Sequence, residues 1–371
     1  IFRNDNPGFI PDKKLDSFIK GEIKKKKELV LLRNSESLQL FLIIDKDKSL
    51  NDQNEKARKL GSMAFDQLKT AGFETVYLHA ESDVLLLALT EGLVLRSYVF
   101  NKYKSDRKAF QIKDIIAKFN GEADELKNVL SAVYWSRDLV NEPPDHLSAI
   151  ELSERFKSMG KTAEISVEVM EKLQLESLRM GGVLAVNRGS IEEPTFSILS
   201  WKPKNVKNKK PFVLVGKGVV YDTGGINLKP TGFLETMKSD MSGSAVVAGV
   251  MKALAENKIP AYVLAIIPAT DNRPGQNAIV PGDIITMYNG ATVEIINTDA
   301  EGRLILADGL AFSEKFKPQL VFSVATLTGS ASRTFGSNVI AGMGNAKQHL
   351  DTLKKCGFEV GEKIAELPFW D

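Results

Sequence analysis

The sequence has very few of the residues that build disulfide frameworks or thiolate metal cages. Among 371 residues there is one cysteine, Cys356, and only three histidines, which lie far apart. A single cysteine excludes an internal disulfide and a cysteine-based metal cage, and it fits a reducing, cytoplasmic setting. The spacing of the histidines excludes a zinc-binding helix of the H-E-x-x-H type. Any metal bound by this chain must therefore be held by carboxylates.

Long apolar runs and an excess of one charge sign are also missing. The apolar runs at 40–44 and 84–89 are far shorter than the ~18 residues that cross a bilayer. The chain has 49 Lys and Arg against 47 Asp and Glu, which gives a formal net charge of +2. Such a balance provides no electrostatic footprint for a polyanion. We therefore expect neither a membrane nor a nucleic acid among the partners.

Length and composition indicate a globular protein with two domains. The chain is 43% hydrophobic and 26% charged, and domains average about 150 residues. In the first third, strand-like segments at 39–44 and 75–79 alternate with helical segments at 52–70, capped by Asp52, and at 82–100. This βαβα order predicts a mostly parallel sheet. The chain begins with Ile-Phe-Arg, and we interpret it as part of a longer protein.

The remainder of the chain has the pattern of a second, larger α/β unit. Buried strands are predicted at 212–216, 261–268 and 319–327, and a hairpin with a type I′ turn is predicted at Asn289-Gly290. We therefore expect an α/β protein in which a smaller N-terminal α/β domain precedes a larger α/β domain with a central mixed, mostly parallel sheet. The expected boundaries are 1–125 for the first domain, 126–144 for a linker helix and 145–371 for the second domain.

Charged residues follow the predicted strands and precede the predicted helices of the second unit. The strand at 212–216 leads to Lys217 and Asp222, and the carboxyl ends of strands border the ligand crevice in open α/β sheets. Asp240 precedes a helical run, and Asp299 and Glu301 precede another. Taken alone, each of these acids is most simply a helix N-cap or a complement to the helix dipole.

Taken together, the four acids favour a shared site. Four carboxylates that converge in a crevice repel one another unless positive charge compensates them. Lys217, Lys229 and Arg303 could supply that charge as an ion-pair network, and two divalent cations such as Mg²⁺, Mn²⁺ or Zn²⁺ could also supply it. A pair of metals about 3.5–4 Å apart would activate a bridging water, which predicts hydrolysis, with Lys229 or Arg303 facing the oxyanion.

Two stretches carry a resemblance to a known family. The segments 215–230 (VGKGVVYDTGGINLKP) and 297–308 (NTDAEGRLILAD) resemble the leucine aminopeptidase, or cytosol aminopeptidase, family of di-metal exopeptidases. Weaker matches lie at 180–189 (MGGVLAVNRG), 281–283 (PGD) and 326–329 (TLTG). The similarity extends from Tyr134 to the end of the chain. The 145–371 domain would therefore be the catalytic aminopeptidase domain.

The resemblance implies a role for each site residue. It places Lys217, Asp222, Asp240 and Glu301 around one metal, and Asp222, Asp299 and Glu301 around the other. It implies that Lys229 polarises the scissile carbonyl and that Arg303 holds a bicarbonate acting as general base. It also implies that Met237 lines the pocket for the first side chain, and that Thr326 and the Leu327 carbonyl lie near the substrate backbone. We expect Asp240 to bind the free α-amino group of the substrate together with a metal.

The expected function is therefore the removal of N-terminal residues from peptides with a free N-terminus. The implied cofactors are two divalent metal ions, zinc or manganese, with magnesium also compatible, and bicarbonate. The implied assembly is a homohexamer in the cytoplasm. A two-metal phosphoesterase and a non-catalytic oligomeric scaffold are the alternatives. The chain departs from the family pattern at Tyr221, where Phe is usual, and at Ser242 and Ser244. It also ends at Asp371, so we expect a C-terminally incomplete catalytic domain.

Overall fold

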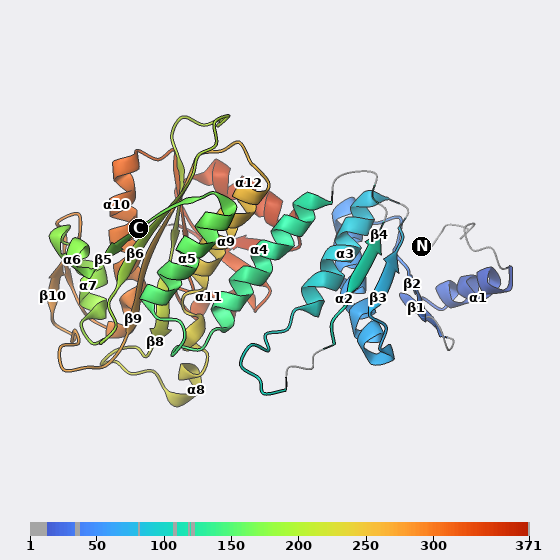
Figure 1. Cartoon of the computed structure of the whole chain (residues 1–371), viewed down its shortest axis with the longest axis horizontal. Helices are drawn as coiled ribbons and strands as arrows, with labels where there is room; N and C mark the ends of the chain where they lie inside the picture. The colour runs from blue at the N-terminus through green and yellow to red at the C-terminus, as the bar shows by residue number, and fades with distance from the viewer. Residues whose placement is uncertain are drawn as a thin grey trace. The chain divides into compact units, whose positions relative to one another are not determined.

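The structure is a computed structural model that describes residues 13–33, 38–80, 82–106, 110–117, 119 and 123–369 (Figure 1). The chain divides into two compact units, one formed by 1–130 with 329–371 and the other by 131–328. Helix α4 (Asp124–Asn141) lies where the linker helix is predicted and ends before Pro143. The predicted domain boundaries stay a prediction. Within the described residues, no helix combines the length and the apolar character needed to cross a bilayer.

In its described residues, the first unit contains three two-stranded sheets and a pair of packed helices. Its N-terminal elements are α1 (Lys13–Lys24), β1 (Leu29–Arg33), β2 (Leu38–Leu42), α2 (Leu50–Ala71), β3 (Thr75–Leu78), α3 (Asp83–Ser97) and β4 (Asp114–Ala117). Its C-terminal elements are α11 (Ser330–Phe335), β13 (Val339–Gly342), α12 (Lys347–Glu359) and β14 (Lys363–Glu366).

Glycines allow α2 and α3 to pack closely in this unit. A Cβ on Gly61 would lie 2.2 Å from the Leu89 carbonyl, and one on Gly92 would lie 1.9 Å from the Arg58 carbonyl. The N-cap of α2 is Ser49, whose hydroxyl accepts the Asp52 N–H. The predicted cap at Asp52 is therefore wrong, because the serine three residues earlier satisfies that donor.

The N-terminal strands do not form the single, mostly parallel sheet that the sequence predicts. Strand β1 pairs with β2 in antiparallel fashion, and β3 pairs with β4 in parallel fashion. The chain between β1 and β2 is too short for a crossover, so those two strands can pair only as a hairpin. A cavity of about 960 Å³ lies between β2, β3 and the two helices, and its lining includes no predicted site residue.

The second unit is built around a six-stranded sheet. Its first elements after α4 are α5 (Ala149–Ala163), β5 (Ser166–Glu171), α6 (Lys172–Ser177), α7 (Gly181–Asn187), β6 (Thr195–Trp201), β7 (Phe212–Gly216), β8 (Gly218–Asp222) and α8 (Thr231–Leu234). Those that follow are η1 (Met237–Ser239), α9 (Ser242–Glu256), β9 (Val263–Asn272), β10 (Ile284–Thr286), β11 (Thr292–Glu294), η2 (Thr298–Ala300), α10 (Glu301–Ser313), η3 (Glu314–Phe316) and β12 (Leu320–Val324).

The sheet is mixed and mostly parallel, as predicted. Its order is β12-β7-β9-β6-β5, with β8 also pairing with β9. Strands β12, β7, β8 and β9 pair in parallel, whereas β6 and β5 are antiparallel to their neighbours. The buried strand β9 alternates its apolar side chains between the two faces, Ala265 and Ile267 on one and Leu264 and Ile266 on the other.

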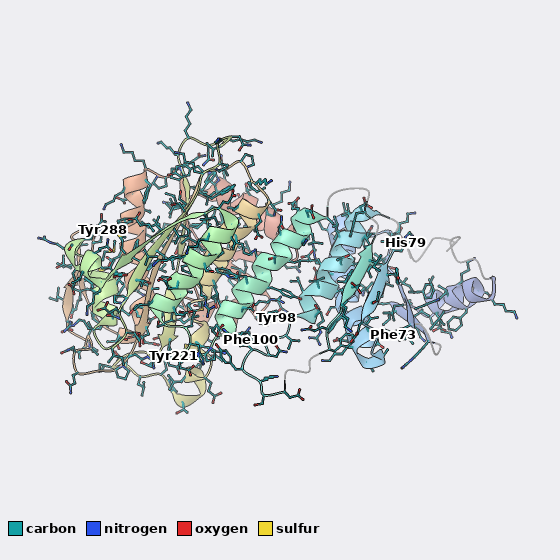
Figure 2. The ribbon with its side chains drawn as sticks, in the orientation of Figure 1. Phe73, His79, Tyr98, Phe100, Tyr221 and Tyr288 are labelled. Atoms are coloured by element: carbon teal, nitrogen blue, oxygen red, sulfur yellow. The ribbon has the colours of Figure 1, made fainter. Side chains whose placement is uncertain are left out.

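Helices cover both faces of this sheet (Figure 1). Helices α5 and α9 pack on one face, around residues such as Phe156 and Met251. Helices α7 and α10 pack on the other face. There, Tyr288, labelled in Figure 2, packs against Phe312 with ring centroids 5.7 Å apart. Since β7, β8, β9 and β12 are parallel, their carboxyl ends meet at one edge of the sheet, where the charged residues lie.

The predicted hairpin is present as β10 and β11, but its turn is of another type. Gly290 has a φ of 86°, whereas Asn289 is not among the residues with positive φ. A type I′ turn needs positive φ at both positions. The Gly290 N–H instead donates to the Met287 carbonyl, which closes a turn with Gly290 as its left-handed last residue. Of the two residues Asn289 and Gly290, only the glycine therefore adopts the positive φ that was expected of both.

Candidate metal centre

Lys217 lies between β7 and β8 and is fixed along its whole length. Its backbone N–H donates to the Val324 carbonyl at 3.0 Å, and its own carbonyl accepts the Ser244 N–H at 2.9 Å. Its side chain is only 3% exposed and runs over Gly302 at the start of α10. A Cβ on Gly302 would lie 2.5 Å from the Lys217 Cε, so only glycine leaves room for this lysine.

The Lys217 ammonium joins three separate segments of the chain. Its Nζ lies 2.8 Å from Asp240 Oδ1 and 2.9 Å from Glu301 Oε1. It also donates to the Thr326 carbonyl at 3.2 Å, and the Thr326 hydroxyl donates to Asp240 Oδ1 at 2.7 Å. These contacts bring the end of η1, the start of α10 and the segment after β12 to one point. We call this the Lys217 group.

A second lysine makes a parallel arrangement nearby. The Lys229 Nζ lies 2.8 Å from Asp222 Oδ2 and 2.5 Å from Asp299 Oδ1. Lys229 is 15% exposed and Asp299 is 34% exposed, so this arrangement is more open to solvent than the first. We call it the Lys229 group. Its ammonium shows that the space between Asp222 and Asp299 accepts a cation.

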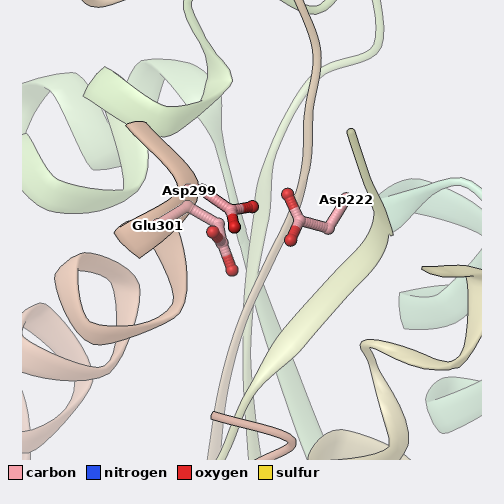
Figure 3. A group of neighbouring side chains, drawn as sticks. All are labelled: Asp222, Asp299 and Glu301. Carbon is pink, nitrogen blue, oxygen red and sulfur yellow. The ribbon is translucent and has the colours of Figure 1, made fainter. Parts of the chain in front are cut away.

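Three carboxylates link the two groups. Asp222 ends β8, while Asp299 and Glu301 stand at the junction of η2 and α10, and the three side chains point toward one another (Figure 3). One oxygen of each lies within 4.8 Å of the others. This separation is small enough for the three acids to bind a common ion. Asp222 and Glu301 are therefore neighbours, as the sequence predicts.

The lysines do not balance the acids. Four carboxylates, those of Asp222, Asp240, Asp299 and Glu301, surround two ammonium groups, which leaves two negative charges uncompensated when all four acids are ionised. Glu301 Oε2 is buried and has no hydrogen-bond partner in the described part of the chain. An unpaired buried carboxylate oxygen is costly unless a cation binds it. The donor set consists of oxygens, which suits hard divalent cations.

Burial and charge shift the pKa values in the Lys217 group. Burial raises the pKa of Asp240 to about 7, although Lys217 opposes that shift. Burial also lowers the pKa of Lys217, but the charges of Asp240 and Glu301 outweigh it and hold that pKa above its ordinary value. Both directions are expected when two carboxylates share one ammonium. Lys217 is therefore charged here, and its predicted place beside a metal stays a prediction.

The simple helix-cap interpretation fails for two of the acids. The N-cap residue of α9 is Met241, and Asp240 directs its carboxylate to Lys217 and Thr326 instead. At η2 the capping side chain is that of Asn297, whose oxygen accepts the Asp299 N–H at 2.8 Å. The carboxylates of Asp240 and Asp299 therefore do not cap these helices.

The remaining predicted residues lie at the margin of the two groups. Arg303 is exposed on α10 and forms no ion pair with any carboxylate of the described residues. Met237 begins η1 and is half-buried, and Leu327 is 46% exposed. Thr326 contacts Asp240, as noted above. The predicted roles of Arg303, Met237 and Leu327 toward bicarbonate and substrate stay predictions.

Sequence reasoning missed the uncharged residues that hold these acids in place. Asn272 ends β9 and donates to Asp222 Oδ1 at 2.8 Å, and Thr298 donates to the Gly224 carbonyl at 2.6 Å. Asn272 follows the predicted strand at 261–268 and lies at the same sheet edge as Asp222. The rule that located Asp222 at a strand end could therefore have located Asn272 as well.

Tyr221 replaces the usual Phe without disturbing the acids. Its hydroxyl donates to the Leu234 carbonyl at 3.1 Å, and the Arg273 guanidinium lies 4.7 Å from the ring centre. Tyr221 is labelled in Figure 2. The additional hydroxyl therefore anchors α8 and makes no contact with the carboxylates.

Comparison with known proteins gives the family. The model of the cytosol aminopeptidase family, catalytic domain, matches residues 134–371. The chain belongs to the cytosol aminopeptidase family. A probable cytosol aminopeptidase from Chlorobaculum tepidum is 48% identical over 305 residues, which cover 77% of this chain and 60% of that protein. One from Phytoplasma australiense is 39% identical and covers 88% of this chain and 68% of that protein.

Solved structures of other proteins have the same fold. A mutant of tomato leucine aminopeptidase has a TM-score of 0.86 and 26% identity, covering 99% of this chain and 77% of that one. The bottromycin maturation enzyme BotP in complex with Mn has a TM-score of 0.84 and 27% identity, covering 95% of this chain and 78% of that one. The chain spans 58–65% of the length of three Chlorobaculum and Chloroherpeton relatives.

Proposed function

We propose that this chain is the metal-binding part of an aminopeptidase that removes the N-terminal residue from peptides. The observation that carries the proposal is the excess of acidic over basic groups where four carboxylates meet two lysines. A structural ion-pair network gives no reason for that excess, because equal numbers of each charge would serve stability better. Membership of the cytosol aminopeptidase family supports peptide hydrolysis rather than another two-metal reaction.

The ligands are assigned from the two groups. Lys217, Asp222, Asp240 and Glu301 would hold one divalent cation, and Asp222, Asp299 and Glu301 would hold the other. When bound, the cations would lower the pKa of a water molecule and polarise a peptide carbonyl. The Mn complex of BotP supports a divalent metal in a protein of this fold. Zinc, manganese and magnesium all fit an oxygen-rich site.

The residues of the chain would select and orient the substrate. Asp240 lies in a buried position and would accept hydrogen bonds from a free α-amino group, so that a blocked or internal amine is rejected. Lys229 is the more accessible lysine, and its fixed positive charge would stabilise the oxyanion that develops on the scissile carbonyl. Thr326 and Leu327 would position the peptide backbone, and Met237 would contact the first side chain.

Three further features belong to the proposal. Arg303 is exposed on α10, two residues after Glu301, and would hold a bicarbonate as general base. A homohexamer in the cytoplasm is proposed from the resemblance to leucine aminopeptidases. The catalytic domain is proposed to start at residue 145.

The test combines metal binding with substrate selection. Protein stripped by a chelator is titrated with Mn²⁺ or Zn²⁺ in a calorimeter, and two ions per chain are expected. The loaded protein is then given leucine p-nitroanilide, its N-acetylated form and p-nitrophenyl phosphate. Hydrolysis of the free-amine anilide alone is expected. Absence of metal binding would support a non-catalytic scaffold, and preferential hydrolysis of the phosphate would support a phosphoesterase.

A further inference from the structure

We propose that Asn272 is a positioning residue that fixes the orientation of Asp222 and joins the two segments that carry the metal ligands. The inference rests on the proposed function. It assigns a role to an uncharged side chain at the end of β9 that contacts neither lysine of the two groups. The residue is 2% exposed, and its amide group donates to two protein acceptors.

Both amide hydrogens of Asn272 are used at the site. Its Nδ2 donates to Asp222 Oδ1 at 2.8 Å and to the Thr298 carbonyl at 3.1 Å. Asp222 ends β8, and Thr298 begins the short helix that carries Asp299 and leads to Glu301. One side chain therefore connects two ligand-bearing segments that lie more than 70 residues apart in the sequence. A substitution of Asn272 would therefore affect both ligand-bearing segments.

These contacts decide which oxygen of Asp222 faces the other acids. Oδ1 accepts two neutral donors, the Asn272 amide and the Gly224 N–H at 2.8 Å. Oδ2 contacts the Lys229 ammonium at 2.8 Å. Because Oδ1 is held by two hydrogen bonds, rotation of the carboxylate is restricted and Oδ2 remains directed at the Lys229 group. Asn272 thereby prepares one oxygen for a cation before any cation binds.

The backbone of Asn272 fixes the loop after Asp222 as well. Its carbonyl accepts the Thr223 N–H at 3.0 Å and the Thr223 hydroxyl at 2.8 Å. The Thr223 carbonyl in turn accepts the Lys229 N–H at 2.9 Å. The backbone of Lys229 is thus connected to the same point as Asp222. The chain can make this close turn because Gly224 has a φ of 87°.

The same unit provides a matched control residue. Asn187 is 5% exposed and also donates two hydrogen bonds, to the Glu192 carbonyl at 2.8 Å and to the Thr270 hydroxyl at 3.1 Å. Its partners are not among the proposed ligands. Loss of either asparagine removes two buried hydrogen bonds of similar length. Only loss of Asn272 removes a hydrogen bond to a ligand carboxylate.

The experiment compares Asn272→Ala with Asn187→Ala in the chelator-stripped protein. Mn²⁺ binding is measured by calorimetry, and stability without metal is measured by urea unfolding. Asn272→Ala is expected to weaken Mn²⁺ binding by about 10- to 100-fold, the range typical for residues that orient ligands. Asn187→Ala is expected to bind Mn²⁺ within about threefold of wild type while losing comparable stability. If Asn272→Ala does not fold, Asn272→Ser is measured by the same criterion, because its shorter hydroxyl cannot reach both acceptors.

The outcomes separate this inference from the proposed function. Equal Mn²⁺ affinity in wild type and Asn272→Ala would overturn the positioning role while leaving the metal site intact. Equal losses of affinity in the two alanine variants would also overturn it, because a general loss of stability would then explain both. If the wild-type protein bound neither Mn²⁺ nor Zn²⁺, the proposed function itself would fail, and the inference would fail with it. A selective loss in Asn272→Ala would support both.

Discussion

The Lys217 and Lys229 groups have the same composition, one lysine between two carboxylates, but their surroundings differ. Lys217 is 3% exposed, is bound to a backbone carbonyl and lies over Gly302. Lys229 is 15% exposed, and one of its partners, Asp299, is 34% exposed. The comparison shows that two similar arrangements of a lysine and two carboxylates can differ in burial and in the number of contacts that hold the lysine.

This difference agrees with the division of labour in the proposed mechanism. A lysine held from several sides cannot follow a changing substrate, but it can hold ligands in place. A lysine with fewer restraints and partial access to solvent can face charge that develops during a reaction. The two lysines should therefore respond differently to substitution, and the paired alanine variants described below test that expectation. Three other experiments address Glu301, Asp240 and Tyr221.

The largest effect is expected from removal of Glu301, because this substitution should disturb both the Lys217 group and the Lys229 group. Glu301 contacts Lys217 through Oε1 and lies within ligand distance of Asp222 and Asp299. Glu301→Ala is expected to abolish hydrolysis and to reduce bound metal from two ions per chain to less than one. Elemental analysis and the leucine p-nitroanilide assay measure the two effects. Full activity in the purified variant would contradict the assignment.

The next largest effect is expected from substitution of the two lysines, which should separate an effect on turnover from an effect on metal content. Lys229→Ala removes the accessible cation and is expected to lower kcat by about 10²- to 10³-fold, the usual cost of losing one group that stabilises an oxyanion. Bound metal is expected to remain close to two ions per chain. The matched variant Lys217→Ala is expected to lose metal together with activity. Equal metal loss in both variants would show that the two lysines have one role.

A smaller effect concerns the pH dependence of stability without metal. The pKa of Asp240 is raised from 3.8 to about 7 in the folded protein, so the folded state binds this proton more tightly than the unfolded state does. The contribution to stability is therefore full at low pH and declines as pH rises from about 4 to about 7, by at most about 1.4 kcal/mol per pH unit. The raised pKa of Lys229 contributes nothing in this window.

Asp240→Asn is the control for that pH dependence, because its side chain does not titrate. Urea unfolding of the metal-free protein at pH 5, 6 and 7 should give a flatter profile in the variant than in wild type. Burial also raises the pKa of Asp308, but that residue is present in both proteins. Parallel profiles would show that Asp240 does not carry the effect.

The smallest effect is expected from Tyr221→Phe, which changes neither lysine group. The variant loses one hydrogen bond to the Leu234 carbonyl, and the free energy of unfolding should fall by about 1 kcal/mol. Metal content and kcat are expected to match wild type. Urea unfolding and the anilide assay measure these quantities. A large loss of metal would mean that this hydroxyl acts on the site after all.

The sequence was sufficient to locate the acidic residues, but not the uncharged residues that hydrogen-bond to them. Asp222 follows an apolar strand, and Asp299 and Glu301 precede a helix, so simple rules about strand and helix ends place them at one sheet edge. The partners of Asn272 lie 50 and 26 residues away, and no local pattern specifies such contacts. Hydrogen bonds between distant segments depend on the packed fold, which local rules do not provide.

Membership of a motif also does not reveal what each residue does. Asp308 ends the 297–308 stretch, yet its fully buried carboxylate accepts the backbone N–H groups of Val183 and Tyr288. It therefore connects α10 to α7 and to the hairpin and contributes no ligand. The pairing of β1 with β2 was likewise not predicted, because the apolar segment at 39–44 does not specify its partner strand.

The close approach of Lys217 to Gly302 has a consequence for how such a site can vary. Because position 302 has no side chain, the start of the helix that carries Glu301 can lie against the Lys217 side chain. Any larger residue would push the ammonium away from its carboxylates or shift the start of α10. Position 302 therefore helps to determine where the Lys217 ammonium lies.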